Sequence, residues 1–78
     1  MITVRLFAAA AEAAGQDTEQ VTATTAGELR DALSARHGDD LRRVLARCSL
    51  LVDGRVAAAG DPLPDDVVVD VLPPFAGG

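Results

Sequence analysis

The sequence contains no lysine, and it has seven arginines. A chain without lysine has no ε-amine, so an activated carboxyl group of this protein would find no side-chain amine of its own to acylate. For the same reason, the protein is not expected to form lysine-linked chains of itself. A GC-rich coding bias would explain the composition without any function, and the chemical consequence is the same in either case.

Cysteine and histidine are each present once. The single cysteine, Cys48, excludes an internal disulfide and a cysteine-based metal site. It lies between a helical segment and an apolar strand, which predicts a buried, inert thiol rather than a nucleophile or sulfur relay. His37 ends a predicted helix, where a favourable interaction with the helix dipole explains it without catalysis. No phosphate-binding, dinucleotide-binding or triad motif is present, so we expect no metal, no bound cofactor and no independent catalysis.

Aromatic residues are also scarce, because Phe7 and Phe75 are the only two. With 49% of the residues apolar, the core must be built from valine, leucine, isoleucine and alanine. The length allows one small domain, near the lower limit for a core without a disulfide or metal. The formal charge of −5 argues against binding to nucleic acid or an anionic membrane and favours docking onto a basic surface. No leader or long apolar span is evident, so we expect a cytoplasmic protein.

The first half of the chain predicts two strands and two helices before a short helical turn. Apolar residues alternate over residues 2–7, an alanine-rich helix over residues 8–14 ends at Gly15, and residues 18–23 are expected to pair with the first strand.

Thr25 and Glu28 form a predicted capping box, and Gly38 ends the central helix. The apolar stripe expected to face a sheet is Ala26, Leu29, Ala32 and Leu33. In the following helical turn Leu41, Val44 and Leu45 should point inward. The arginines at 36, 42, 43 and 47 form either a solvated surface or a basic patch for a partner.

The second half predicts strands. Asp53-Gly54 between the apolar segments 49–52 and 55–59 is a strong hairpin signal. After a proline-rich loop at residues 60–64, the last strand covers residues 67–72. Burying Asp70 without a partner would be costly, so Val67, Val69 and Val71 should face the helix. This order predicts an α+β fold in which a sheet carries a helix across one face.

The last six residues are expected to leave that sheet as an extended tail. Pro73 and Pro74 cannot donate to a ladder and end the strand, and both fix φ. At ~3.1 Å per residue, a polyproline-like path would carry the chain about 19 Å from the body. Gly77 and Gly78 have no side chains, so a terminal carboxylate could enter a narrow channel. Because a carboxylate with a pKa near ~3.5 is ionised and a poor electrophile, it would need activation, most simply adenylation by ATP in a partner enzyme.

Leu72 is expected on the outer face of the last strand, beside the start of this tail. Val56 on the hairpin strand and Phe75 just beyond the prolines would extend the apolar surface there. Exposed apolar groups beside a functional tail indicate a docking surface. The alternative is that Leu72 and Phe75 fold back onto the body as ordinary cover.

The ending LPPFAGG, after the acidic turn Asp65-Asp66 and a valine-rich strand, resembles the end of MoaD-type sulfur carriers. These ubiquitin-like proteins form the small subunit of molybdopterin synthase, and the resemblance covers the chain from end to end. It implies a β-grasp fold with a mixed four- to five-stranded sheet and one main helix packed across it. Residues 1–72 would form the domain and residues 73–78 a flexible Gly-Gly tail.

The same resemblance implies a function in sulfur transfer for the dithiolene of molybdopterin. A MoeB-like adenylating enzyme would use ATP on the Gly78 carboxylate, and a sulfur donor would convert it into a thiocarboxylate. The tail, with Pro73, Pro74, Phe75, Ala76 and Gly77 before Gly78, would enter the large synthase subunit of a heterotetramer. Val56, Leu72 and Phe75 would contact the enzyme and that subunit. Phe75 differs from the smaller residue common at this position in the family.

Three other functions remain open at this stage. The protein could carry sulfur for another pathway, such as thiamine or cysteine synthesis. It could be a ubiquitin-like covalent modifier that transfers its C-terminus to lysines of targets. It could also be an interaction domain whose tail is inert.

Overall fold

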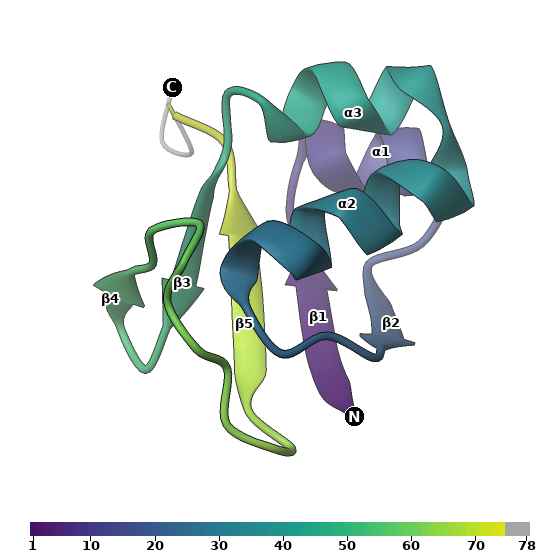
Figure 1. Ribbon diagram of the computed structural model, residues 1–78. Helices are drawn as coiled ribbons and strands as arrows, with labels where there is room; N and C mark the ends of the chain where they lie inside the picture. Colours follow the sequence, from purple (N-terminus) through teal and green to yellow (C-terminus); the bar gives the residue numbers. More distant parts are fainter. Residues whose placement is uncertain (75–78) are drawn as a thin grey trace.

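The computed structural model describes residues 1–74, which form five strands and three helices (Figure 1). In chain order the elements are β1 (Ile2–Leu6), α1 (Ala9–Ala14), β2 (Thr18–Val21), α2 (Ala26–His37), α3 (Asp39–Leu45), β3 (Ser49–Val52), β4 (Arg55–Val56) and β5 (Val68–Leu72). The prediction of an α+β fold with a mixed sheet is therefore confirmed. Two shorter helices, α1 and α3, accompany the main helix α2.

The sheet has the strand order β2-β1-β5-β3-β4, so the last strand lies in its middle. β5 is parallel to β1 and antiparallel to β3, while the β1–β2 and β3–β4 pairs are antiparallel. The predicted pairing of residues 18–23 with the first strand is confirmed, although β2 ends at Val21. All three helices lie on one face of the sheet, and the other face carries no helix (Figure 1).

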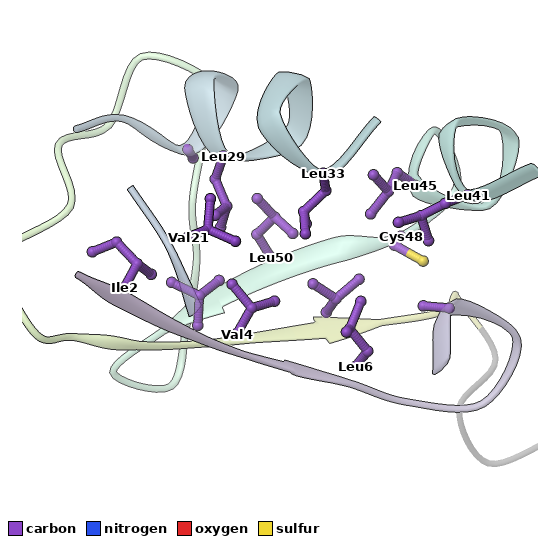
Figure 2. Close-up of a cluster of buried hydrophobic side chains, with 14 of the residues drawn as sticks. Ile2, Val4, Leu6, Val21, Leu29, Leu33, Leu41, Leu45, Cys48 and Leu50 are labelled. Atoms are coloured by element: carbon purple, nitrogen blue, oxygen red, sulfur yellow. The ribbon is translucent and has the colours of Figure 1, made fainter. Parts of the chain in front are cut away.

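The core lies between the sheet and the helices (Figure 2), and among residues 1–74 no aromatic side chain belongs to it. Strand alternation supplies one side of it, because Val4, Val69 and Val71 are fully buried. Leu29 and Leu33 of α2 supply much of the other side, as the apolar stripe predicts. The structure thus confirms that Val69 and Val71 face the helices and that Asp70 does not.

The start of α2 differs in one detail from the predicted capping box. Thr25 Oγ1 accepts a hydrogen bond from the Glu28 backbone N–H at 3.1 Å, as expected for an N-cap. The Glu28 carboxylate accepts from the backbone N–H of Thr24 at 2.8 Å, one residue before the predicted donor. The hydrogen bonds from Thr24 lower the pKa of Glu28. The two side chains still satisfy backbone donors at the start of the helix.

The strand boundaries after the hairpin also differ from prediction. β4 comprises only Arg55–Val56, whereas the apolar pattern predicts a strand over residues 55–59. The backbone leaves the ladder because a turn follows, in which the Asp61 carboxylate accepts from the Ala58 N–H at 2.8 Å. β5 begins at Val68, one residue later than expected, and Val67 is half-buried at its start. These changes shorten the edge strand and leave the position of β5 unchanged.

A buried carboxylate in β2 is the largest feature that the sequence pattern did not predict. The Glu19 side chain is only 4% exposed, forms an ion pair with Arg36 at 2.9 Å and shares a hydrogen bond with His37 Nε2 at 2.6 Å. Burial raises the pKa of Glu19, but hydrogen bonds from Gln16 and His37 outweigh it, so the pKa is lowered overall. His37 therefore has a specific partner beyond the helix dipole, and this cluster joins the C-terminal turn of α2 to β2.

Replacing this carboxylate should make stability less dependent on pH. Because the folded-state pKa of Glu19 lies below the ordinary value of 4.5, its stabilisation is present above that pH and is lost as the pH falls through the folded-state pKa. We expect Glu19→Gln to lower the free energy of unfolding by about 1.5–3 kcal/mol at pH 7. The difference from the wild type should shrink by pH 3. Urea unfolding at both pH values measures this, with the exposed Glu12→Gln as control, and an equal loss at both pH values would contradict it.

Candidate functional site

The root of the predicted tail is Pro73 and Pro74, which directly follow the central strand β5. Leu72 pairs with Ser49 of β3, and Val71 pairs with Leu6 of β1. The pairings of β5 with β1 and with β3 therefore fix the chain up to the residues just before the prolines. Pro73 is half-buried and Pro74 is exposed. The predicted tail residues Phe75, Ala76, Gly77 and Gly78 lie outside the described residues.

The helix-free face of the sheet carries an apolar surface beside this root. The registers Ser49–Leu72, Leu51–Asp70 and Leu51–Val56 place alternate residues of β5, β3 and β4 on the same face. We call the set Leu51, Val56 and Leu72 the outer-face patch. Val56 is 69% exposed, whereas Leu51 and Leu72 are half-buried. The structure thus places two of the three predicted docking residues, Val56 and Leu72, on one face.

An ion pair borders the outer-face patch. Arg5 donates from Nε and Nη2 to the two carboxylate oxygens of Asp70, at 2.6 and 2.8 Å. These hydrogen bonds to Asp70 raise the pKa of Arg5. The Arg5 guanidinium also lies 6.0 Å from the ring centroid of Phe7, which is 39% exposed. Asp70 therefore avoids the core with its charge neutralised, and the pair places a fixed polar group next to the apolar surface.

Sequence reasoning missed Leu51, Phe7 and Arg5 as members of this face. Strand β3 is apolar at three successive positions, so alternation alone does not show that Leu51 faces outward. A partner for Asp70 could have been sought in another strand, but only the β1–β5 register identifies Arg5. These residues share a face because of pairings between distant segments.

Cys48 is buried, as predicted. It is 6% exposed, and burial raises the pKa of its thiol, which lowers the thiolate fraction at neutral pH. Its backbone carbonyl accepts a hydrogen bond from Arg30 of α2 at 2.8 Å. These features are those of a structural residue.

Within residues 1–74, no three His, Cys, Asp or Glu side chains are grouped so that they could hold a metal ion. In the same part of the chain, every helix is too short or too polar to cross a membrane. The described part of the site consists of a surface and the root of the predicted tail.

Comparison with known proteins places this fold among ubiquitin-like carriers and modifiers. The chain has a TM-score of 0.82 and 31% identity to small archaeal modifier protein 1 (SAMP1) from Haloferax volcanii, over 99% of this chain and 98% of that one. A putative molybdopterin converting factor, subunit 1, from Pyrococcus furiosus has a TM-score of 0.84 and 25% identity, over 95% and 97% of the two chains. Among curated proteins, none matches the chain significantly.

A third solved structure contains a partner. The complex of subunits 1 and 2 of the molybdopterin-converting factor from Helicobacter pylori matches with a TM-score of 0.72 and 26% identity, over 99% of this chain and 97% of that one. These likenesses, with the five-stranded sheet and its covering helices, define the class as a ubiquitin-like β-grasp protein of the sulfur carrier and modifier type. The ThiS family model matches residues 4–78, and the chain belongs to the ThiS family.

Proposed function

We propose that the protein carries sulfur on the Gly78 carboxyl group as the small subunit of a molybdopterin synthase. The observation that carries this proposal is the position of Pro73 and Pro74. They follow a strand held on both sides, beside an exposed apolar patch, and lead to the sequence Gly77-Gly78. Two of the similar structures reported above are molybdopterin converting factor proteins, and one of these is a complex of its two subunits.

In the proposed cycle, the protein supplies recognition and reach, and its partners supply catalysis. A Gly78 carboxylate oxygen attacks the α-phosphorus of ATP in a MoeB-like enzyme, pyrophosphate leaves, and an acyl adenylate forms. A sulfur nucleophile from a donor then attacks the carbonyl carbon, AMP leaves, and a thiocarboxylate remains. In the large synthase subunit, the thiocarboxylate sulfur would bond to a carbon of a pterin precursor. Water would then cleave the bond between this sulfur and the Gly78 carbonyl carbon, which leaves the sulfur on the precursor and regenerates the carboxylate. No lysine of the chain competes for the activated intermediate, because there is none.

Intact-mass analysis tests this proposal directly. The protein is incubated with ATP, an activating enzyme and a sulfur source. We expect a mass increase equal to the replacement of one oxygen by sulfur, located by fragmentation at Gly78. Addition of the large subunit and the pterin precursor should then return the original mass and produce a dithiolene. An unchanged mass under conditions that load a known carrier would overturn the proposal.

A covalent modifier is the second candidate, because SAMP1 from Haloferax volcanii is 31% identical over almost the whole chain. The same activation would then end in an amide bond to lysines of other proteins. Enrichment of branched Gly-Gly adducts from cells expressing the tagged chain would support the modifier. A thiocarboxylate without adducts supports the carrier. Sulfur delivery for thiamine or cysteine synthesis is separated by giving the loaded protein each acceptor enzyme in turn.

A further inference from the structure

A second surface meets the tail root, on the side of the sheet that carries the helices. A groove with a volume of about 490 Å³ opens there, and we call it the tail-root groove. That volume lies within the roughly 300–1,000 Å³ range of ligand sites, so a large side chain would fit. The apolar residues that line it are Ala9, Val44, Ala46, Cys48, Pro73 and Pro74. The outer-face patch lies on the opposite face of the sheet, so the root is flanked by two separate surfaces.

Two arginines of the groove make it locally basic in an acidic chain. Arg43 and Arg47 line it, although the formal charge of the whole chain is −5. Within residues 1–74, the Arg47 side chain forms neither an ion pair nor a hydrogen bond. Arg43 pairs with Asp40 at 2.7 Å, but both side chains are largely exposed, and such a pair contributes little and is easily exchanged. Among the described residues, neither guanidinium group is therefore held by a buried carboxylate.

The prolines connect this groove to the tail. Pro73 and Pro74 form part of its lining and are also the first residues that a protein enclosing the tail would meet. An enzyme that draws residues 75–78 into an active site would therefore lie close to the groove. An apolar floor with two cations at its edge is complementary to an apolar side chain flanked by carboxylates.

We propose that the tail-root groove is a recognition site for an acidic segment of the activating enzyme, which inserts an apolar side chain between Arg43 and Arg47. This inference rests on the proposed function, because it assumes that an ATP-dependent enzyme engages the tail. The groove would contribute to selection of the enzyme, since a basic pair beside the tail root attracts an acidic segment and repels a basic one. The outer-face patch remains free for contacts on the other face.

The test reverses the charge of Arg43 on α3 and of Arg47 just after it, with a control at a neighbouring position of α3. The double variant Arg43→Glu and Arg47→Glu is compared with Arg42→Glu, because Arg42 is exposed on α3, pairs with Asp39 and does not line the groove. With the cognate activating enzyme, the KM for the double variant should rise about tenfold or more, with kcat unchanged. The wild-type KM should increase with salt, and this dependence should weaken in the double variant. The KM of Arg42→Glu should stay within about threefold of the wild-type value.

The outcomes separate this inference from the proposed function. If the wild-type protein is never adenylated, the proposed function fails, and this inference fails with it. If the wild type is adenylated and the double variant has the KM of Arg42→Glu, only the groove proposal is overturned. Sedimentation velocity of the protein alone tests whether a second copy of the chain occupies the groove. If the oligomeric state differs between the wild type and the double variant, the groove is a contact between copies and the proposal is overturned. Circular dichroism melting controls for folding, and Arg43→Gln with Arg47→Gln provides a milder variant with the same expected direction.

Discussion

Deleting Gly77 and Gly78 abolishes thiocarboxylate formation and leaves the thermal melting temperature unchanged. This result is expected because residues 2–71 already supply a core of fifteen buried residues between the sheet and the helices, and glycines have no side chain to add to it. The two glycines supply the unhindered carboxyl end that the activating enzyme would adenylate. Without them the chain would end at Ala76, two residues short of its full reach, or ~6 Å less at ~3.1 Å per residue. Intact mass reports loading, and calorimetry reports folding.

A one-residue extension should have the same effect by a different route. Adding a tryptophan after Gly78 keeps every residue of the chain but moves the carboxylate and places a bulky side chain beside it. We expect no detectable loading with an unchanged melting temperature, whereas the same extension before Met1 should load normally. Met1 lies at the start of β1, at the other end of the sheet from Pro73 (Figure 1). A C-terminally extended protein that still accepts sulfur at its end would rule out the proposed mechanism.

Placing two carboxylates in the outer-face patch should weaken partner binding by at least about 100-fold. In the double variant Val56→Asp and Leu72→Asp, each introduced charge would have to be buried against an apolar partner surface, at a cost of several kcal/mol. Val56 is 69% exposed, so its replacement should cost little stability. Leu72 is half-buried, so a loss of about 1–2 kcal/mol is expected there. Isothermal titration with the large synthase subunit and with the activating enzyme measures the affinity.

The control for each single substitution is Ala35→Asp, which adds one carboxylate at an exposed position of α2, on the helix side of the molecule. Its affinity should stay close to that of the wild type. Single variants divide the effect between the two positions, and Leu51→Asp tests the residue between them that sequence reasoning missed. Wild-type affinity in the folded double variant would show that the patch is not the docking surface.

The sequence predicts this fold well where a single residue determines which side of a strand or helix is buried, or where the element ends. Asp70 among valines determines which side of the last strand is buried, and Val69 and Val71 are accordingly inaccessible. The central helix is predicted equally well, because Thr25 and Gly38 mark its ends and its apolar stripe faces the sheet. In each case the signal is local, and the physical cost of the alternative is large.

The remaining features depend on contacts between segments far apart in the chain. Glu19 shares the inward face of β2 with Val21, and a carboxylate is not expected there; it is buried because the end of α2 brings Arg36 and His37 over it. The tail-root groove requires α3, the start of α1 and the two prolines to meet, which no local pattern encodes. The shortening of β4 follows from the turn that Asp61 closes. The alanines at residues 57–59 do not themselves indicate whether the strand continues.

The position of β5 links biosynthesis to quality control. The ribosome makes this strand after all the others, yet it lies between β1 and β3, so the sheet stays in two unjoined halves until β5 emerges. A nascent chain interrupted before Val68 therefore cannot complete the core and should be degraded as an unfolded fragment. Every copy that survives as a folded protein has consequently been translated almost to the prolines, so defective carriers without a tail root would be removed before they could occupy a partner.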